Sequence, residues 1–249
     1  KQFEEQWSTV CGVGHGVGVA NGMDAIEIAL LGLSIGGGDE VITTPMTAFA
    51  TILAIIRSGA TPVLADIDSE TALLSIESVR RSLTTNTKAV ILVHLYGQVR
   101  QMDEWVNFCE ENKIMLIEDC AQAHQATWQG KVAGCFGQAG AYSFYPTKNL
   151  GAVGDAGMLV TNNSTLAEKA RQLRNYGQSE RYLHPVVGMN SRLDEIQAVM
   201  LSERMKWLPE FTKYRRQIAD TYHAKIDNPL VKHLIKPEQK SAHVYHLFV

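Results

Sequence analysis

Residues 88–119 read KAVILVHLYGQVRQMDEWVNFCEENKIMLIED, and this stretch decides the fold class. It opens with an almost continuous apolar run rich in β-branched residues, Lys88–His94, and closes with a second apolar run, Ile114–Ile117. Between them, the spacing of apolar residues in Asp103–Asn112 predicts an amphipathic helix. Two continuously apolar strands joined by a helix indicate parallel strands in a sheet that is covered on both faces.

The same alternation of apolar runs and helical spacing continues on both sides of this stretch. Further strands are predicted at Gly16–Ala20, Glu40–Thr43, Thr61–Ala65, Ala141–Phe144 and Gly157–Thr161. Further helices are predicted at Met23–Leu33, Thr47–Arg57 (as a buried helix), Glu77–Leu83, Leu166–Asn175, Asp194–Lys206 and Phe211–Lys225. The sequence therefore predicts an α/β fold with a mostly parallel central sheet flanked by helices.

The composition is that of an ordinary globular protein, with 45% hydrophobic and 20% charged residues among 249. The formal net charge of −3 gives no electrostatic reason to expect nucleic acid or an anionic membrane as a partner. The longest apolar stretches, near Ala48–Ile56 and Ala89–Val93, are far shorter than the ~20 residues of a bilayer span. The four cysteines include no C-x-x-C spacing, which favours buried, reduced thiols and a cytoplasmic protein.

The polar residues at the carboxyl ends of the predicted strands are the first candidates for a functional site, because ligands of parallel sheets bind there. These residues are Asn21-Gly22, Asp66, His94 and Asp119. Asp119 could keep a pyridinium nitrogen protonated, or it could cap the helix that follows. The turn at Asn21–Asp24 opens a helix, whose free N–H groups suit a phosphate.

Lys148 is the second kind of candidate. It follows an apolar strand and stands among small residues in SFYPTKNLGA, residues 143–152. A loop lysine is usually exposed, but a desolvated lysine has a lowered pKa and can form a Schiff base. A phosphate-binding helix start, a strand-end acid, this lysine and the Ser143 hydroxyl together favour a site for pyridoxal phosphate.

Seven sequence segments, in order along the chain, carry a resemblance to a known family. They are VGVANGMDAIEIAL (17–30), PMTAFATILAI (45–55), HLYGQ (94–98), EDCAQAHQA (118–126), YSFYPTKNLGAVGDAGMLVT (142–161), RNYGQ (174–178) and GMNSRLDEIQA (188–198). The chain resembles the DegT/DnrJ/EryC1/StrS sugar aminotransferases, a family of pyridoxal phosphate enzymes. The resemblance runs essentially from end to end and implies the aspartate aminotransferase-like fold, fold type I.

The resemblance implies pyridoxal 5′-phosphate as the cofactor and gives roles to the residues around its ring. Lys148 would hold the cofactor as a Schiff base and later move a proton between the substrate carbon and the cofactor. Asp119 would pair with the ring nitrogen, and Gln122 would contact the phenolic oxygen or the adjoining face. Phe49 would stack on the ring, although a core position in its helix is an equally open interpretation.

The phosphate of the cofactor would be bound, on the same resemblance, by the Met23 and Asp24 amides after Gly22 and by the Ser143 hydroxyl. Family members commonly have Gly-Thr where this chain has Gly22-Met23. The threonine hydroxyl is therefore missing here, and only the backbone contact can be carried over.

The resemblance also implies a homodimer with shared active sites. Asn190 resembles the residue that reaches the phosphate from a neighbouring subunit, while a loop or helix-start role is the alternative for it. Tyr176 and His184 lie where the family's substrate loops approach the sugar. These three residues would complete the site from outside the cofactor pocket.

The reaction implied by the resemblance transfers an amino group from an amino acid, usually glutamate, to a ketone on a nucleotide-linked deoxysugar. The segment from Arg174 to Ala198 resembles members that aminate C3 of a thymidine-diphosphate-linked 3-keto-6-deoxyhexose, with C4 as the alternative. Related sugar dehydratases carry His at the lysine position, so Lys148 favours transamination. A non-catalytic regulatory member of the same family is the alternative from another functional class.

Two other classes of enzyme fit the sequence less well. The alternating glycines Gly12, Gly14, Gly16 and Gly18 superficially resemble a nicotinamide-binding motif, but G-x-G-x-x-G is not completed. The pair His243-x-x-His246 suggests a metal site, but H-E-x-x-H is missing and the eight histidines are scattered. We therefore expect no metal.

The domain organisation expected from the matched segments is a large cofactor domain, residues 1–210, followed by a linking helix and the start of a small, incomplete α+β domain, residues 211–249. The apolar segment His243–Val249 is predicted to be the first strand of that second domain. On the same resemblance, family members extend further at both ends, so the chain is expected to be part of a longer enzyme.

Overall fold

The core of the computed structural model, which describes residues 1–249, is a seven-stranded sheet in the order β1-β9-β8-β5-β4-β2-β3. Its strands are β1 (His15–Val19), β2 (Glu40–Thr43), β3 (Thr61–Leu64), β4 (Thr87–Val93), β5 (Met115–Asp119), β8 (Ala139–Ser143) and β9 (Gly157–Thr161). Neighbouring strands from β3 to β8 are parallel, whereas β9 is antiparallel to both β8 and β1. The predicted α/β fold with a mostly parallel sheet is confirmed.

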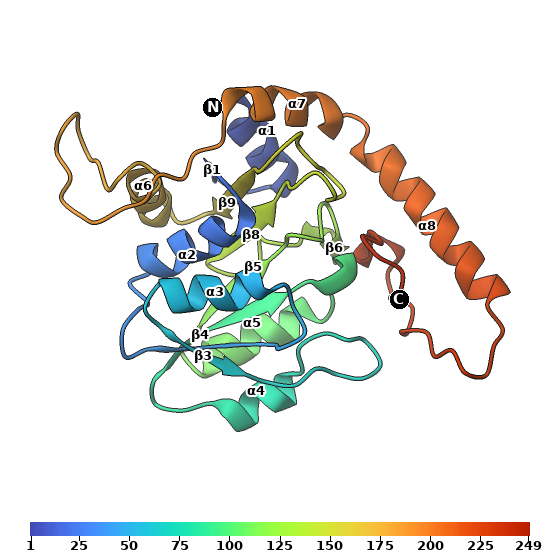
Figure 1. Ribbon diagram of the computed structural model, residues 1–249. Helices are drawn as coiled ribbons and strands as arrows, with labels where there is room; N and C mark the ends of the chain where they lie inside the picture. Colours follow the sequence, from blue (N-terminus) through green and yellow to red (C-terminus); the bar gives the residue numbers. More distant parts are fainter.

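Helices cover both faces of this sheet (Figure 1). One face packs against α2 (Gly22–Gly32), α3 (Phe49–Arg57) and α6 (Ser164–Leu173). The other face packs against α1 (Gln2–Cys11), α4 (Ile76–Ser82) and α5 (Met102–Glu111). Along β4, Ala89 and Ile91 pack into the hydrophobic core on the first face, whereas Val90 and Leu92 pack into the core on the other face. Burial on both faces explains why this strand is apolar at nearly every position.

The aromatic residues of α1 hold the strand that leads to Lys148, although the sequence patterns did not single out this helix. The ring of Trp7 is fully buried, and its centroid lies 5.1 Å from that of Tyr142 and 5.4 Å from that of Phe144. Both contacts are edge-on, the geometry that aromatic pairs prefer. A short hairpin, β6 (Thr127–Trp128) and β7 (Lys131–Val132), is also unpredicted.

Helix α3 is less buried than the predicted helix Thr47–Arg57. It begins at Phe49, and the side chains of Phe49 and Ile56 are 66% and 49% exposed. Only one side of the helix, including Thr51, faces the core. The prediction of a buried helix is therefore wrong for its outer face, because no other element of this chain covers those apolar residues.

The last part of the chain leaves the sheet through α7 (Glu195–Met205) and α8 (Leu208–Lys225) and then folds back beside α8 (Figure 1). The prediction of a strand at His243–Val249 is wrong. A 3₁₀ turn, η2 (Lys240–Ala242), is followed by a single β-bridge between His243 and Gln98. Tyr245 has a φ of 46°, a left-handed conformation that interrupts extended backbone.

The remaining sequence expectations concern thiols and membrane spans. All four cysteines are buried and free, as the sequence predicted. Of the helices, none has the length and apolarity needed to cross a bilayer.

Candidate active site

Asp119 ends β5 at the carboxyl edge of the sheet, and its side chain is buried. Its Oδ2 accepts a hydrogen bond from the Thr51 hydroxyl at 2.8 Å, and its Oδ1 accepts one from the backbone N–H of Ala121 at 3.1 Å. Donors to both oxygens fix the plane of the carboxylate. The helix-capping alternative for Asp119 is wrong, because β5 is followed by turns and not by a helix.

Lys148 lies in the turn that follows β8, where its backbone N–H donates to the Tyr145 carbonyl at 2.8 Å. Burial lowers the pKa of the Lys148 ammonium below its ordinary value, while the negative charge of Asp119 opposes this shift. The amine is therefore more readily deprotonated than a surface lysine, as a Schiff-base nucleophile must be. Lys148 is half-buried, which agrees with the sequence expectation that this lysine is partly desolvated.

The start of α2 meets the end of β8 at a very close approach. A Cβ atom on Gly22 would lie 2.8 Å from the Ser143 Cβ and 3.2 Å from the Ser143 backbone N. Only glycine fits this contact, so the helix N-terminus lies directly against Ser143. The structure thus brings together the helix start and the hydroxyl that the sequence assigned to one anion site.

One part of the predicted anion site needs correction. The Asn21 side chain caps α2, its Oδ1 accepting from the Asp24 amide at 2.8 Å. This satisfies the amide that we expected to bind phosphate, whereas the amides of Gly22 and Met23 have no acceptor within the helix. The Asp24 carboxylate is also turned away, toward Arg57 at 4.0 Å.

Gln122 lies in the turn that follows Asp119, and Phe49 opens α3. The Gln122 Oε1 accepts from the Tyr96 backbone N–H at 2.6 Å, which leaves its amide N–H₂ group as a donor. Tyr96 has a φ of 61°, a strained conformation for a residue with a side chain. Phe49 opens α3, two residues before Thr51, with an exposed ring.

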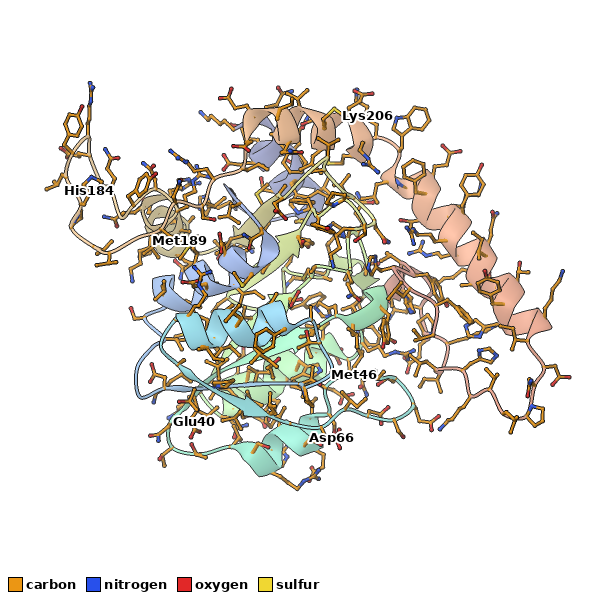
Figure 2. The ribbon with its side chains drawn as sticks, in the orientation of Figure 1. Glu40, Met46, Asp66, His184, Met189 and Lys206 are labelled. Carbon is orange, nitrogen blue, oxygen red and sulfur yellow. The ribbon has the colours of Figure 1, made fainter.

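Tyr176 and His184 belong to a loop after α6, and Asn190 follows it, next to Ser191, whose hydroxyl accepts from the Ala20 backbone N–H at 3.0 Å. The His184 Nδ1 contacts the Tyr176 carbonyl at 2.9 Å, and Asn190 forms an isolated β-bridge with Asn175. No hydrogen bond joins any of the three to Lys148, Asp119 or Ser143. Figure 2 shows His184 at the far end of a loop that projects from the body, well away from Met46 near the start of α3. We call residues 176–189 the projecting loop.

Comparison with known proteins decides the family. A sequence model of the DegT/DnrJ/EryC1/StrS aminotransferase family matches residues 1–249. The chain belongs to this family. The resemblance inferred from the seven segments is confirmed.

Characterised relatives of this family member include enzymes named for amino sugars. It is 44% identical over 247 residues to a dTDP-3-amino-3,6-dideoxy-alpha-D-galactopyranose transaminase of Aneurinibacillus thermoaerophilus, covering 99% of this chain and 68% of that protein. It is 43% identical over 250 residues to a pleiotropic regulatory protein of Geobacillus stearothermophilus, covering 100% of this chain and 67% of that one. The chain therefore spans about two thirds of the length of these relatives.

Solved structures of the family share its fold. The structure of DesV from S. venezuelae, in complex with a ketimine intermediate, superposes with a TM-score of 0.95 at 39% identity, covering 99% of this chain and 67% of that one. The structure of ntda from Bacillus subtilis, with bound cofactor PMP, has a TM-score of 0.92 at 32% identity, covering 99% and 57%. The expected fold type I is confirmed.

His124 is a further residue of the site that the sequence reasoning passed over, although it lies in the matched segment EDCAQAHQA. It is fully buried, and its Nε2 lies 3.0 Å from the Ser143 carbonyl oxygen. Because a carbonyl only accepts, Nε2 must carry the proton. Burial, reinforced by the charge of Lys148, lowers the pKa of His124 to about 3, so the ring is neutral.

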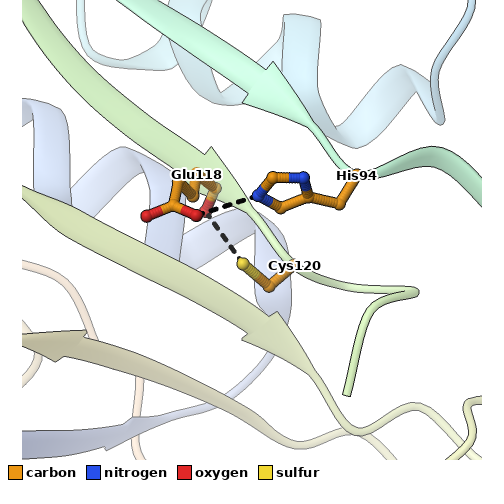
Figure 3. A group of neighbouring side chains, drawn as sticks. All are labelled: His94, Glu118 and Cys120. Carbon is orange, nitrogen blue, oxygen red and sulfur yellow. Dashed lines mark hydrogen bonds and ion pairs between the residues drawn. The ribbon is translucent and has the colours of Figure 1, made fainter. Parts of the chain in front are cut away.

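The other two strand ends singled out in the sequence serve different purposes. Asp66 is exposed, and its carboxylate accepts from the adjacent Ile67 N–H. His94 is buried, and its Nε2 lies 2.9 Å from a Glu118 carboxylate oxygen. Figure 3 shows this pair with Cys120, three side chains whose ligand atoms lie close enough to suggest a metal site.

The surroundings of Glu118 favour a structural role for this group. One carboxylate oxygen accepts from the Gly134 amide at 2.7 Å, and the other accepts from the amides of Phe136 at 2.7 Å and Gly137 at 3.0 Å. Burial raises the pKa of the Cys120 thiol well above its ordinary value, which keeps the sulfur protonated and a poor ligand. Glu118 thus fastens the turn at residues 134–137 onto β5.

Proposed function

We propose that this chain is a pyridoxal-phosphate-dependent aminotransferase that moves an amino group from an amino acid to the ketone of a nucleotide-linked deoxysugar. The observation that carries the proposal is Lys148, a partly buried amine with a lowered pKa, close to Asp119 in a member of an aminotransferase family. Relatives named as nucleotide-sugar transaminases support the substrate class.

The residues present fit pyridoxal phosphate at each of its chemical groups. The Lys148 amine suits the aldehyde, the Asp119 carboxylate suits the ring nitrogen, and the exposed Phe49 ring offers an aromatic face. The free Gly22 and Met23 amides and the Ser143 hydroxyl suit the phosphate. When bound, the cofactor supplies an electron sink and carries the amino group between the two substrates.

The work of the protein in this reaction is to position groups and to hold protons. Lys148, with its lowered pKa, can give up its proton and later accept one from the substrate carbon. Asp119, locked by two donors, holds a positive charge on the ring nitrogen. The free amide of Gln122 is available to the phenolic oxygen, because its carbonyl already holds the Tyr96 backbone.

Amination at C3 of a dTDP-3-keto-6-deoxyhexose is the finer proposal. Relatives named for 3-amino sugars or a 3-amino transfer are 44%, 41% and 42% identical, whereas the GDP-perosamine synthases are 33% and 36% identical. Amination at C4 is the alternative outcome of the assay. We propose glutamate as the donor, as the family resemblance implies.

A homodimer with shared active sites is a further part of the proposal. The projecting loop carries His184 away from the body, whereas Tyr176 and Asn190 lie at its two ends, at the base. Large apolar side chains are exposed on the adjacent α7, with Ile196 67% and Val199 68% exposed. Apolar surface of this kind is typical of a protein interface. We propose that the loop reaches the sugar, and Asn190 the phosphate, in the partner's site.

The remaining proposals concern organisation and compartment. We propose that residues 1–210 form the cofactor domain and that residues 211–249 begin a second domain, with α8 as the linking helix. The free, buried cysteines support a reducing compartment, which we propose to be the cytoplasm.

The assay that tests the function is glutamate-dependent amination of dTDP-linked 3-keto and 4-keto deoxysugars. We expect a 3-amino sugar nucleotide and 2-oxoglutarate in equal amounts. Turnover with simple keto acids but with neither sugar nucleotide would assign the protein to another aminotransferase group.

A non-catalytic regulatory role is the second candidate, because the relative of Geobacillus stearothermophilus is named a regulatory protein. Binding of pyridoxal phosphate without amino transfer to any nucleotide sugar would favour that role.

A further inference from the structure

We propose that the hydroxyls of Thr47 and Thr51 form a relay that positions Asp119 for the cofactor, with Thr51 as the essential positioning residue. This inference rests on the proposed function, since it concerns the acid assigned to the ring nitrogen. The relay links two elements that the sequence separates widely, because Thr51 belongs to α3 and Asp119 to β5.

The direction of the hydrogen bonds follows from the donors available. The Thr51 hydroxyl donates to the Asp119 Oδ2 at 2.8 Å, and this uses its only hydrogen. The Thr47 and Thr51 oxygens are also 2.8 Å apart. Thr47 must therefore donate to Thr51. The chain runs from Thr47 through Thr51 to the carboxylate, and each bond polarises the next.

Burial makes this contact strong. Thr51 is fully buried and Asp119 is nearly so, so water does not compete for the bond. Hydrogen bonds to carboxylates are stronger than those between neutral groups, and a low local dielectric strengthens them further. The second oxygen of Asp119 is held by a backbone N–H, which no side-chain substitution removes. Thr51 is therefore the one of the two hydrogen-bond donors to Asp119 that a side-chain substitution can remove.

The relay also fixes the position of Asp119 relative to the helix that carries Phe49. Both residues belong to α3: Thr51 is fully buried against Asp119, and Phe49, two residues earlier, is 66% exposed. One hydroxyl thus ties the helix that presents the stacking ring to the strand that presents the acid.

The experiment compares Thr51→Val, Thr51→Ser and Thr47→Val in protein reconstituted with pyridoxal phosphate. Thr51→Val removes the hydroxyl at nearly constant volume and should weaken pyridoxal phosphate binding about 10-fold or more. It should also move the pH midpoint of the bound cofactor's absorption by about 0.5 unit or more, because the acid is no longer held in one orientation. Thr51→Ser should return the affinity to within about 3-fold of the wild type, and Thr47→Val should weaken it about 2- to 4-fold.

Thr212→Val is the matched control, because the Thr212 hydroxyl is buried on α8 without a hydrogen-bond partner. It should bind pyridoxal phosphate as the wild type does. Wild-type affinity and absorption in Thr51→Val would overturn the proposal. Wild-type affinity and absorption in Thr47→Val would overturn it as well. If Thr51→Val does not fold, Thr47→Val alone provides the test. A wild-type protein that binds no pyridoxal phosphate would instead refute the proposed function.

Discussion

At the scale of single residues, Lys148 lies among groups that are neutral or opposite in charge. Burial, with the charge of Lys148 itself, lowers the pKa of His246 to about 4 and that of His124 to about 3. Both imidazoles are therefore uncharged at neutral pH, so neither repels a cationic amine nor competes for Asp119. Two neutral rings and one carboxylate keep the amine available for reversible protonation.

The His124 ring makes stability depend on pH. Its pKa is about 3 in the folded protein and about 6.5 when unfolded, so below pH 6.5 the unfolded state takes up a proton that the folded state does not. Stability present above pH 6.5 is therefore lost as the pH falls toward 3. Between pH 6.5 and 5 this one group should cost about 2 kcal/mol.

Urea unfolding of the wild type and of His124→Gln at several pH values measures this effect. Glutamine can still donate to the Ser143 carbonyl but does not titrate in this range. We expect a shallower loss of stability in His124→Gln between pH 6.5 and 5. Identical slopes for the two proteins would show that His124 does not carry the effect.

The sequence predicted that Lys148, Asp119 and Ser143 belong to one site, but it could not predict which hydrogen-bonding atoms there lack a partner within the chain. The family resemblance assigns the Asp24 amide to the phosphate, yet the Asn21 side chain accepts from that amide. Thr51 gave no signal of its own, because a threonine in an apolar helix is ordinary and its partner Asp119 lies 68 residues away. Contacts of this kind depend on tertiary packing.

At the scale of elements, the contact between α2 and β8 forms the proposed anion site. A methyl group on Gly22 would meet both the side chain and the backbone of Ser143. Gly22→Ala should therefore push the helix start away from β8, destabilising the protein by about 1–3 kcal/mol and weakening pyridoxal phosphate binding.

Gly37→Ala is the matched control, since a Cβ at Gly37 meets nothing within 4 Å. Thermal unfolding and cofactor titration of both variants test the contact. Gly22→Ala with wild-type stability and affinity would mean that α2 and β8 are not packed as described.

Elements were predictable where burial dictates the residue pattern. The strands β4 and β5 are apolar on both faces because each face packs against helices, and their sequences are correspondingly continuous. The segment His243–Val249 has a similar apolar pattern, but it lies against η1 (Leu95–Gly97) without joining the sheet. Composition alone does not reveal the left-handed turn at Tyr245.

At the scale of the whole molecule, the residues proposed for the site are divided between the body and the projecting loop. Lys148 and Asp119 lie at the edge of the sheet, whereas Tyr176 and His184 contact each other in the loop. This division is the physical basis for the proposed dimer with shared sites.

Mixing two inactive variants, Lys148→Ala and Asn190→Ala, tests the sharing. If Asn190 acts in the partner's site, each mixed dimer regains one intact site, and random mixing should restore roughly a quarter of the wild-type activity. If Asn190 acts within its own chain, mixing restores nothing. Size-exclusion chromatography with light scattering checks that mixed dimers form.

The whole account depends on Lys148 as the point of attachment for pyridoxal phosphate. The most direct measurement loads the purified protein with pyridoxal phosphate, reduces it with borohydride and locates the modified residue by peptide mass spectrometry. We predict a visible absorption band before reduction and a single stable modification at Lys148 afterwards. A protein that gains no absorbance, or that is modified at other lysines but not at Lys148, would contradict the account.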